Sequence, residues 1–159
     1  MKISLQHVLI LTVSLVCAAR SVKSSTQPFT LSLETEQNVV KARSDVKVNV
    51  TLRNSSNQAI YMSLGSEEID YAIDVRDSQG GLAPDTDFAR KLKRRPYYAS
   101  VQVFSLKPGE SLPKATLSIT KFYDLSRPDK YTIQVSRAVP KELGGGTIKS
   151  NTITVTVSE

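Results

Sequence analysis

Cysteine, histidine and tryptophan are almost absent from this 159-residue chain, which has one cysteine, one histidine and no tryptophan. Cys17 and His7 both lie in the first 19 residues, a segment that we expect to be removed on export. The remaining chain then has no Ser-His-Asp triad, no thiol nucleophile and no zinc site built from the usual ligands. It also has no disulfide. We therefore predict a protein that is not an enzyme.

Residues 1–19 carry the three-part pattern of a secretory signal peptide. A basic start at Lys2 precedes the apolar run Val8–Val16, and two small residues, Ala18 and Ala19, follow it. The run is shorter than the roughly 20 apolar residues that a membrane-spanning helix needs. We predict cleavage after one of these alanines, a secreted or periplasmic location, and no integral membrane segment after cleavage.

Lipidation of Cys17 is the alternative fate of this segment, and Val16 disfavours it because a small residue is expected before a lipidated cysteine. Removing the signal leaves about 140 residues, which we divide into a flexible polar leader at 20–27 and a single domain at 28–159. Loss of Lys2 with the signal lowers the net charge from +6 to +5. A domain of this length buries about two-thirds of its unfolded surface, so it needs no disulfide.

Apolar and polar residues alternate along much of the domain, which is the pattern of half-buried strands. The clearest run is Asp45–Arg53, where four apolar side chains share one face. Similar alternation predicts strands around Phe29–Leu33, Ile60–Leu64, Tyr71–Val75, Val101–Val103, Leu117–Ile119, Tyr131–Val135 and Ile148–Val157. Pro108 and Gly109 predict a type II turn. About eight strands without a long helical pattern indicate an all-β protein, an antiparallel β-sandwich.

Asp129–Ile133 resembles the tyrosine corner of immunoglobulin-like domains, and Phe29–Val157 as a whole resembles that superfamily. The resemblance implies an immunoglobulin-like antiparallel β-sandwich. It also implies that Tyr131 is buried and that its hydroxyl bonds a backbone group a few residues upstream.

A narrower resemblance covers about Asp45–Val135. It rests on Val50–Ser56, Tyr71–Asp77 with Gly80, Leu106–Glu110 and Asp129–Tyr131. These segments resemble the BsuPI-type proteinase inhibitor domain and small secreted bacterial proteins of unassigned role. The resemblance implies an alternative function, inhibition of a proteinase through an exposed loop, and it implies no particular site residues.

Leu82–Tyr98 interrupts the strand pattern. Acidic residues open the segment at Asp85 and Asp87, Phe88 and Leu92 stand four residues apart, and Pro96 closes it. This order predicts about two helical turns in a long loop, since acid at the start and base at the end suit a helix dipole. Long loops on a rigid scaffold often carry function.

Positive charge is concentrated in the same loop. The cluster and the aromatic residues after it are Arg90, Lys91, Lys93, Arg94, Arg95, Tyr97 and Tyr98. Because Tyr and Arg dominate interface hot spots, we predict a binding site here for a protein or acidic polymer. An acidic glycan, an anionic lipid headgroup and a simple solvated face are alternatives, whereas export argues against nucleic acid. The predicted function is a secreted, non-enzymatic, immunoglobulin-like binding module of unknown ligand.

Calcium is the metal whose preference for oxygen ligands the acidic residues suit best. The candidate ligands are Asp85, Asp87, Asp74, Asp77 and those of Glu67–Asp70. Their spacing matches no known calcium loop, so we predict no metal and no cofactor and interpret Glu67–Asp70 as a solvated connection. Asn49 and Asn54 begin glycosylation sequons, whose use depends on a source that the sequence leaves open.

Overall fold

The computed structural model describes residues 27–94 and 102–159, and the predicted signal peptide, its cleavage site and Val101 lie outside the described residues. In chain order the strands are β1 (Phe29–Glu34), β2 (Val39–Lys41), β3 (Lys47–Asn54), β4 (Ile60–Leu64), β5 (Ala72–Arg76), β6 (Gln102–Leu106), β7 (Ala115–Ser118), β8 (Asp129–Ala138), β9 (Thr147–Lys149) and β10 (Ile153–Ser158). The helical segments are α1 (Glu67–Asp70), α2 (Asp87–Arg94) and the 3-10 turns η1 (Ile119–Lys121) and η2 (Lys141–Leu143). Among the described residues, no helix has the length and apolar character needed to cross a lipid bilayer.

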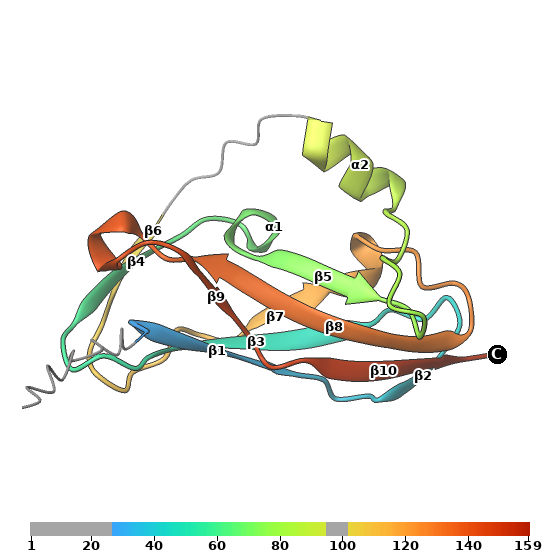
Figure 1. Ribbon diagram of the computed structural model, residues 1–159, viewed down its shortest axis with the longest axis horizontal. Helices are drawn as coiled ribbons and strands as arrows, with labels where there is room; N and C mark the ends of the chain where they lie inside the picture. Colours follow the sequence, from blue (N-terminus) through green and yellow to red (C-terminus); the bar gives the residue numbers. More distant parts are fainter. Residues whose placement is uncertain (1–26, 95–101) are drawn as a thin grey trace, which may run out of the picture.

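The strands form three sheets (Figure 1). The first has the order β1-β3-β7 and is antiparallel. The second has the order β2-β10-β8-β5, with β9 also paired to β8, and only the β2–β10 pair in it is parallel. Strands β4 and β6 make a two-stranded antiparallel sheet. The all-β class predicted from the sequence is confirmed.

One core lies between the two larger sheets. Burial alternates along β3 and along β8 with a period of two residues. Val48 and Val50 from β3 and Ile133 and Val135 from β8 are fully buried in the same apolar cluster. Each such side chain stabilises the fold by about 1.5–3 kcal/mol. Both sheets turn their apolar faces to this core, and β5, the last strand in the order of the second sheet, forms one of its edges.

The predicted contact of Tyr131 is present. Its side chain is 4% exposed, and its hydroxyl donates to the carbonyl oxygen of Arg127 at 3.0 Å. Burial raises the pKa of this hydroxyl, so it stays a neutral donor at physiological pH. The contact fixes the turn that leads into β8.

The described chain has ten strands rather than the predicted eight. Strand β2 lies within residues 37–44, which the sequence pattern had suggested to be a crossover. The carboxyl-terminal stretch, predicted as one strand, is divided into β9 and β10 at Ser150. There the hydroxyl of Ser150 accepts the N–H of Val135 at 3.0 Å, so a side chain replaces a backbone group and interrupts the ladder.

The strand predicted to reach Ile119 ends one residue earlier. The hydroxyls of Ser118 and Thr120 donate to the same carboxylate oxygen of Asp45, at 2.6 and 2.5 Å. These bonds draw the chain into η1, where Ile119 keeps the buried position that the alternation predicted.

One further interpretation is corrected in part, and the structure adds a finding on one of the two sequons. The segment interpreted as a solvated connection contains the short helix α1 (Glu67–Asp70), and its Asp70 is largely buried and faces Arg137. Asn54 is fully buried, and its amide donates to the carbonyls of Gln58 and Leu106 at 2.8 and 2.9 Å. Since both amide hydrogens are used inside the fold, the sequon at Asn54 is not open to glycosylation in the folded protein.

Candidate functional site

The helix predicted in the long loop is α2, which stands above β5 and apart from the two larger sheets (Figure 1). Thr86 begins it, because its side-chain oxygen accepts the N–H of Ala89 at 3.2 Å. The same hydroxyl donates to the carbonyl of Lys121 at 2.6 Å, and the N–H of Thr86 donates to the carbonyl of Phe122 at 2.9 Å. The amino-terminal end of α2 is therefore fixed to η1 and the residue after it.

A cleft of about 540 Å³ lies beneath α2, and we call it the α2–β5 cleft. Three parts of the chain form its walls: α2 with Asp85 in the loop before it, the segment from α1 into β5, and the two residues after η1. Its apolar lining consists of Ile69, Ala72, Ile73, Ala89, Leu92 and Phe122. Asp85, Lys93 and the hydroxyl-bearing Tyr71 and Tyr123 also line the cleft. Ligand pockets of folded proteins have this size and this apolar character with few polar groups.

The floor of the cleft is the outer edge of β5. Ile73 pairs with Val135, whose N–H and carbonyl both bond to Ser150 on the far side of β8, at 3.0 and 2.8 Å. The backbone groups of Ile73 therefore point away from β8, and its carbonyl accepts the hydroxyl of Tyr123. In an antiparallel strand the N–H and carbonyl of one residue point the same way. The N–H of Ile73 thus faces the cleft, and no acceptor for it is found among the described residues.

Tyr123 is hydrogen-bonded to this edge through its hydroxyl. Burial raises the pKa of its hydroxyl, while the nearby charge of Lys93 acts in the opposite direction. The phenol is consequently neutral at physiological pH and acts as a hydrogen-bond donor, as its bond to Ile73 requires.

Two cations of the predicted cluster are already paired. Arg90 bonds the carboxylate of Asp87 and the carbonyl of Asp85. The ammonium of Lys93 contacts both carboxylate oxygens of Asp85, at 2.7 and 2.8 Å. The acidic residues that open the segment therefore lie within reach of these two cations and partly neutralise them. The hydrogen bond from Arg90 also lowers the pKa of Asp87.

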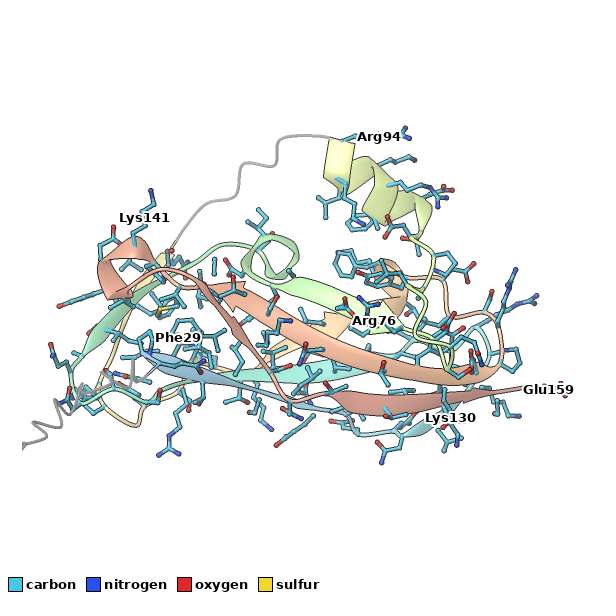
Figure 2. All side chains as sticks on the ribbon, in the orientation of Figure 1. Phe29, Arg76, Arg94, Lys130, Lys141 and Glu159 are labelled. Carbon is cyan, nitrogen blue, oxygen red and sulfur yellow. The ribbon has the colours of Figure 1, made fainter. Side chains whose placement is uncertain are left out.

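Lys91 and Arg94 are exposed, and neither forms an ion pair within the described part of the chain. Figure 2 shows Arg94 at the far end of α2, with its side chain directed away from the sheets. Arg95, Tyr97 and Tyr98 lie outside the described residues, so their part in binding stays a prediction.

Phe88 and Leu92, which the sequence placed on one face of the helix, make different contacts. Phe88 is 41% exposed and packs edge-on against Phe122, with ring centroids 5.7 Å apart. The ammonium of Lys121 lies 4.6 Å from the centroid of the Phe88 ring. Leu92 instead lines the cleft. An aromatic ring thus remains accessible on α2, beside the cation of Lys121.

Four of the carboxylates considered for calcium belong to separate ion pairs: Asp74 with Arg76 at 2.8 Å, Asp70 with Arg137 at 3.6 Å, Asp85 with Lys93 and Asp87 with Arg90. Asp77 instead accepts the N–H groups of Gln79 and Gly81 at 3.0 and 2.8 Å. Within residues 27–94 and 102–159, no three Asp, Glu, His or Cys side chains come together as a possible metal site.

A buried ion pair lies at the end of β8 and was missed by the sequence analysis. Arg137 is 6% exposed, donates to the carbonyl of Ser63 at 2.5 Å, and lies over the ring of Tyr71 at 5.2 Å. Its partner Asp70 also accepts the N–H of Gly65 at 3.0 Å. The pair therefore ties the loop between β4 and β5 to the second sheet. The sequence pattern could have revealed this buried arginine, because position 137 lies two residues after Val135 and therefore on the buried face of β8.

The cleft itself could not be anticipated from the sequence. Ile69, Ala89 and Tyr123 are far apart in the chain and belong to no common motif, and the path of the loops brings them together. No protein-family model matches the sequence, and no curated protein matches it. The cleft combines apolar walls, a strand edge and neighbouring cations. These groups suit the binding of a ligand and include no nucleophile paired with a base.

Proposed function

We propose that this protein is a secreted, non-enzymatic, immunoglobulin-like binding module and that the α2–β5 cleft is its binding site. The observation that carries the proposal is the apolar cleft of about 540 Å³ between a cationic helix and an edge strand. Concave apolar sites with a few polar groups are the usual form of binding sites in folded proteins.

The order of the strands supports the immunoglobulin-like part of the proposal. In immunoglobulin constant-type domains one sheet holds strands A, B, E and D, and the other holds C, F and G. Assigning β1, β3 and β7 to A, B and E, and β5, β8 and β10 to C, F and G, gives the pairing of those domains for these six strands, while the described sheet ends at β7 without a strand D. Tyr131 then lies near the start of strand F, as the tyrosine corner requires.

Secretion rests on the pattern of Met1–Ala19 and has a direct test. Amino-terminal sequencing of the exported protein should give a chain that begins just after Ala18 or Ala19. An exported protein that still begins at Met1 would contradict this part of the proposal.

The binding site is tested by selecting peptides from a random displayed library with the wild-type protein. Leu92→Glu places a charge in the cleft and should weaken the selected peptides about tenfold or more. Leu82→Glu is the matched control, since Leu82 is exposed and lies outside the cleft. If the selected peptides bind the wild type and Leu92→Glu equally well, the binding site lies outside the cleft. If no peptide is selected, the proposal that the protein binds segments of other proteins is contradicted.

A further inference from the structure

The chain already covers part of the outer edge of β5 with a short antiparallel segment of its own. Ala83 donates its N–H to the carbonyl of Val75, and Asp77 donates to the carbonyl of Gly81, both at 2.9 Å. Beyond Ala83 the chain turns away, and Asp85 bridges to Tyr123 instead of continuing along β5. Ile73 is the next outward-facing residue of β5, and it is therefore left without a strand beside it.

We propose that the α2–β5 cleft binds an extended, acidic peptide segment of another protein, which adds as a strand to the edge of β5 at Ile73. This inference rests on the proposed function, because it names the kind of partner for the same cleft. In strand addition, main-chain hydrogen bonds supply affinity and alternate side chains supply specificity.

The backbone of Ile73 can hold such a segment. Its N–H faces the cleft and can donate to a carbonyl of the peptide. Its carbonyl already accepts the hydroxyl of Tyr123, but a carbonyl oxygen has two lone pairs and can accept a peptide N–H as well. The tyrosine hydroxyl thus keeps this edge hydrogen-bonded when the cleft is empty.

The walls of the cleft define the side chains of the partner. One apolar residue of the peptide can pack between Leu92 on α2 and Ile69 beside β5, both of which line the cleft. Alternate residues of a strand point to opposite faces, so the neighbours of that apolar residue point out of the cleft. Lys91 and Arg94 do not line the cleft, but they are exposed on α2 and lack ion pairs within the described residues, so they favour carboxylates in the parts of the peptide that extend beyond the cleft.

A protein segment fits these features better than an acidic polysaccharide does. A sulfated sugar could meet the cations of α2, but it would leave the apolar walls and the N–H of Ile73 unused. Those features are the ones that set the α2–β5 cleft apart from an ordinary cationic surface.

The test uses a fluorescein-labelled peptide in which leucine or valine alternates with glutamate, and fluorescence anisotropy measures its affinity for the protein. Two control peptides carry either N-methyl groups on the central amides or lysine in place of glutamate. Each control should bind about tenfold more weakly, because one removes the backbone donors and the other reverses the charge. Amide hydrogen exchange at Ile73 should slow by about tenfold or more when the first peptide binds.

Variants of the protein test whether the peptide binds at the α2–β5 cleft. Leu92→Glu should weaken binding about tenfold and Leu82→Glu should leave it unchanged. The double variant Lys91→Gln, Arg94→Gln should weaken binding at low salt and less at high salt, since exposed charges are screened. Lys107→Gln, Lys141→Gln is its matched control, because it removes two exposed cations that lie neither on α2 nor in the parts of the chain that line the cleft.

The outcomes separate this inference from the proposed function. Unchanged exchange at Ile73, or full binding of the N-methylated peptide, overturns strand addition, while sensitivity to Leu92→Glu still supports the cleft. No binding of the alternating peptide at about 1 mM also overturns the inference, although library peptides that need Leu92 would keep the proposed function. A third outcome overturns both the proposed binding site and strand addition. In that outcome heparin binds through Lys91 and Arg94, and Leu92→Glu changes the affinity of neither heparin nor the alternating peptide.

Discussion

The hydroxyl of Tyr131 joins the first inward residue of β8 to the turn before it. Its bond to the carbonyl of Arg127 lies in a partly buried environment. Tyr131→Phe should lower the free energy of unfolding by about 0.5–1.5 kcal/mol, measured by urea denaturation. Tyr61→Phe is the control, because Tyr61 is among the most exposed large side chains described, and its loss of a hydroxyl should matter little. Equal effects of the two changes would mean that the corner contact contributes nothing.

Arg137 places a charge where the alternation of β8 calls for an apolar side chain. Removing one partner of a buried ion pair leaves the other charge without compensation, so Arg137→Met should destabilise the protein by about 3–5 kcal/mol. Adding Asp70→Asn should recover part of that loss, since the neutral amide no longer needs a cation. Arg76→Met, which breaks the exposed pair with Asp74, should have a far smaller effect in the same denaturation experiment. Additive effects of Arg137→Met and Asp70→Asn would show that the two residues are not coupled.

Asp45 makes stability depend on pH on the acidic side. Hydrogen bonds from Ser118 and Thr120 lower its pKa below the ordinary value of 3.8. A carboxyl whose pKa is lowered by folding adds stability above that value, and this stability is lost as the pH falls through and below it. Between about pH 5 and pH 3, the urea midpoint should fall more steeply for the wild type than for Asp45→Asn. Ser118→Ala combined with Thr120→Val should flatten the curve in the same way, and parallel curves for all three proteins would contradict the assignment.

At the scale of elements, the strands could be predicted where burial alone decides the pattern. Along β3 and β8, side chains alternate between core and surface over the whole strand, so period-two patterning is sufficient. The turn at Pro108–Gly109 could also be predicted from the sequence. Gly109 has a positive φ of 77°, and Glu110 donates to the carbonyl of Lys107 at 3.0 Å, as a type II turn requires.

Elements set by side chains from distant parts of the chain could not be predicted. The break at Ser150 depends on a bond to Val135, and the start of η1 depends on Asp45, more than 70 residues earlier. Strand β2 has three residues and gains its place by pairing with β10. Short segments of this kind carry too little periodic pattern to be recognised.

The candidate site shows the same division. The helix α2 and its charge were predictable, because acidic residues at its start and basic residues at its end are local signals. The pairing of Lys93 with Asp85 was not predicted, since it depends on how the loop turns before the helix. The apolar cleft was not predictable either, because its walls come from three separate parts of the chain.

In the molecule as a whole, α2 lies outside the main apolar core. The apolar cluster that joins the two larger sheets contains no residue of α2, and Ala89 is the buried residue of the helix. The attachment runs through Thr86, Phe88 and the residues around η1. Local stability should therefore differ between the sheets and the helix, because regions with few buried apolar contacts open at lower free energy.

Lys91→Pro tests this difference. Proline in the interior of a helix removes a hydrogen bond and costs about 3 kcal/mol, which is more than an isolated eight-residue helix can offset. Hydrogen exchange should show lost protection across Asp87–Arg94, with protection along β3 and β8 and the thermal midpoint almost unchanged. Lys91→Ala is the control, since alanine removes the same charge and favours the helix. A large drop in the thermal midpoint for Lys91→Pro, but not for Lys91→Ala, would show that α2 unfolds together with the sheets. In that case a partner bound at the α2–β5 cleft would stabilise the whole molecule and not only the helix.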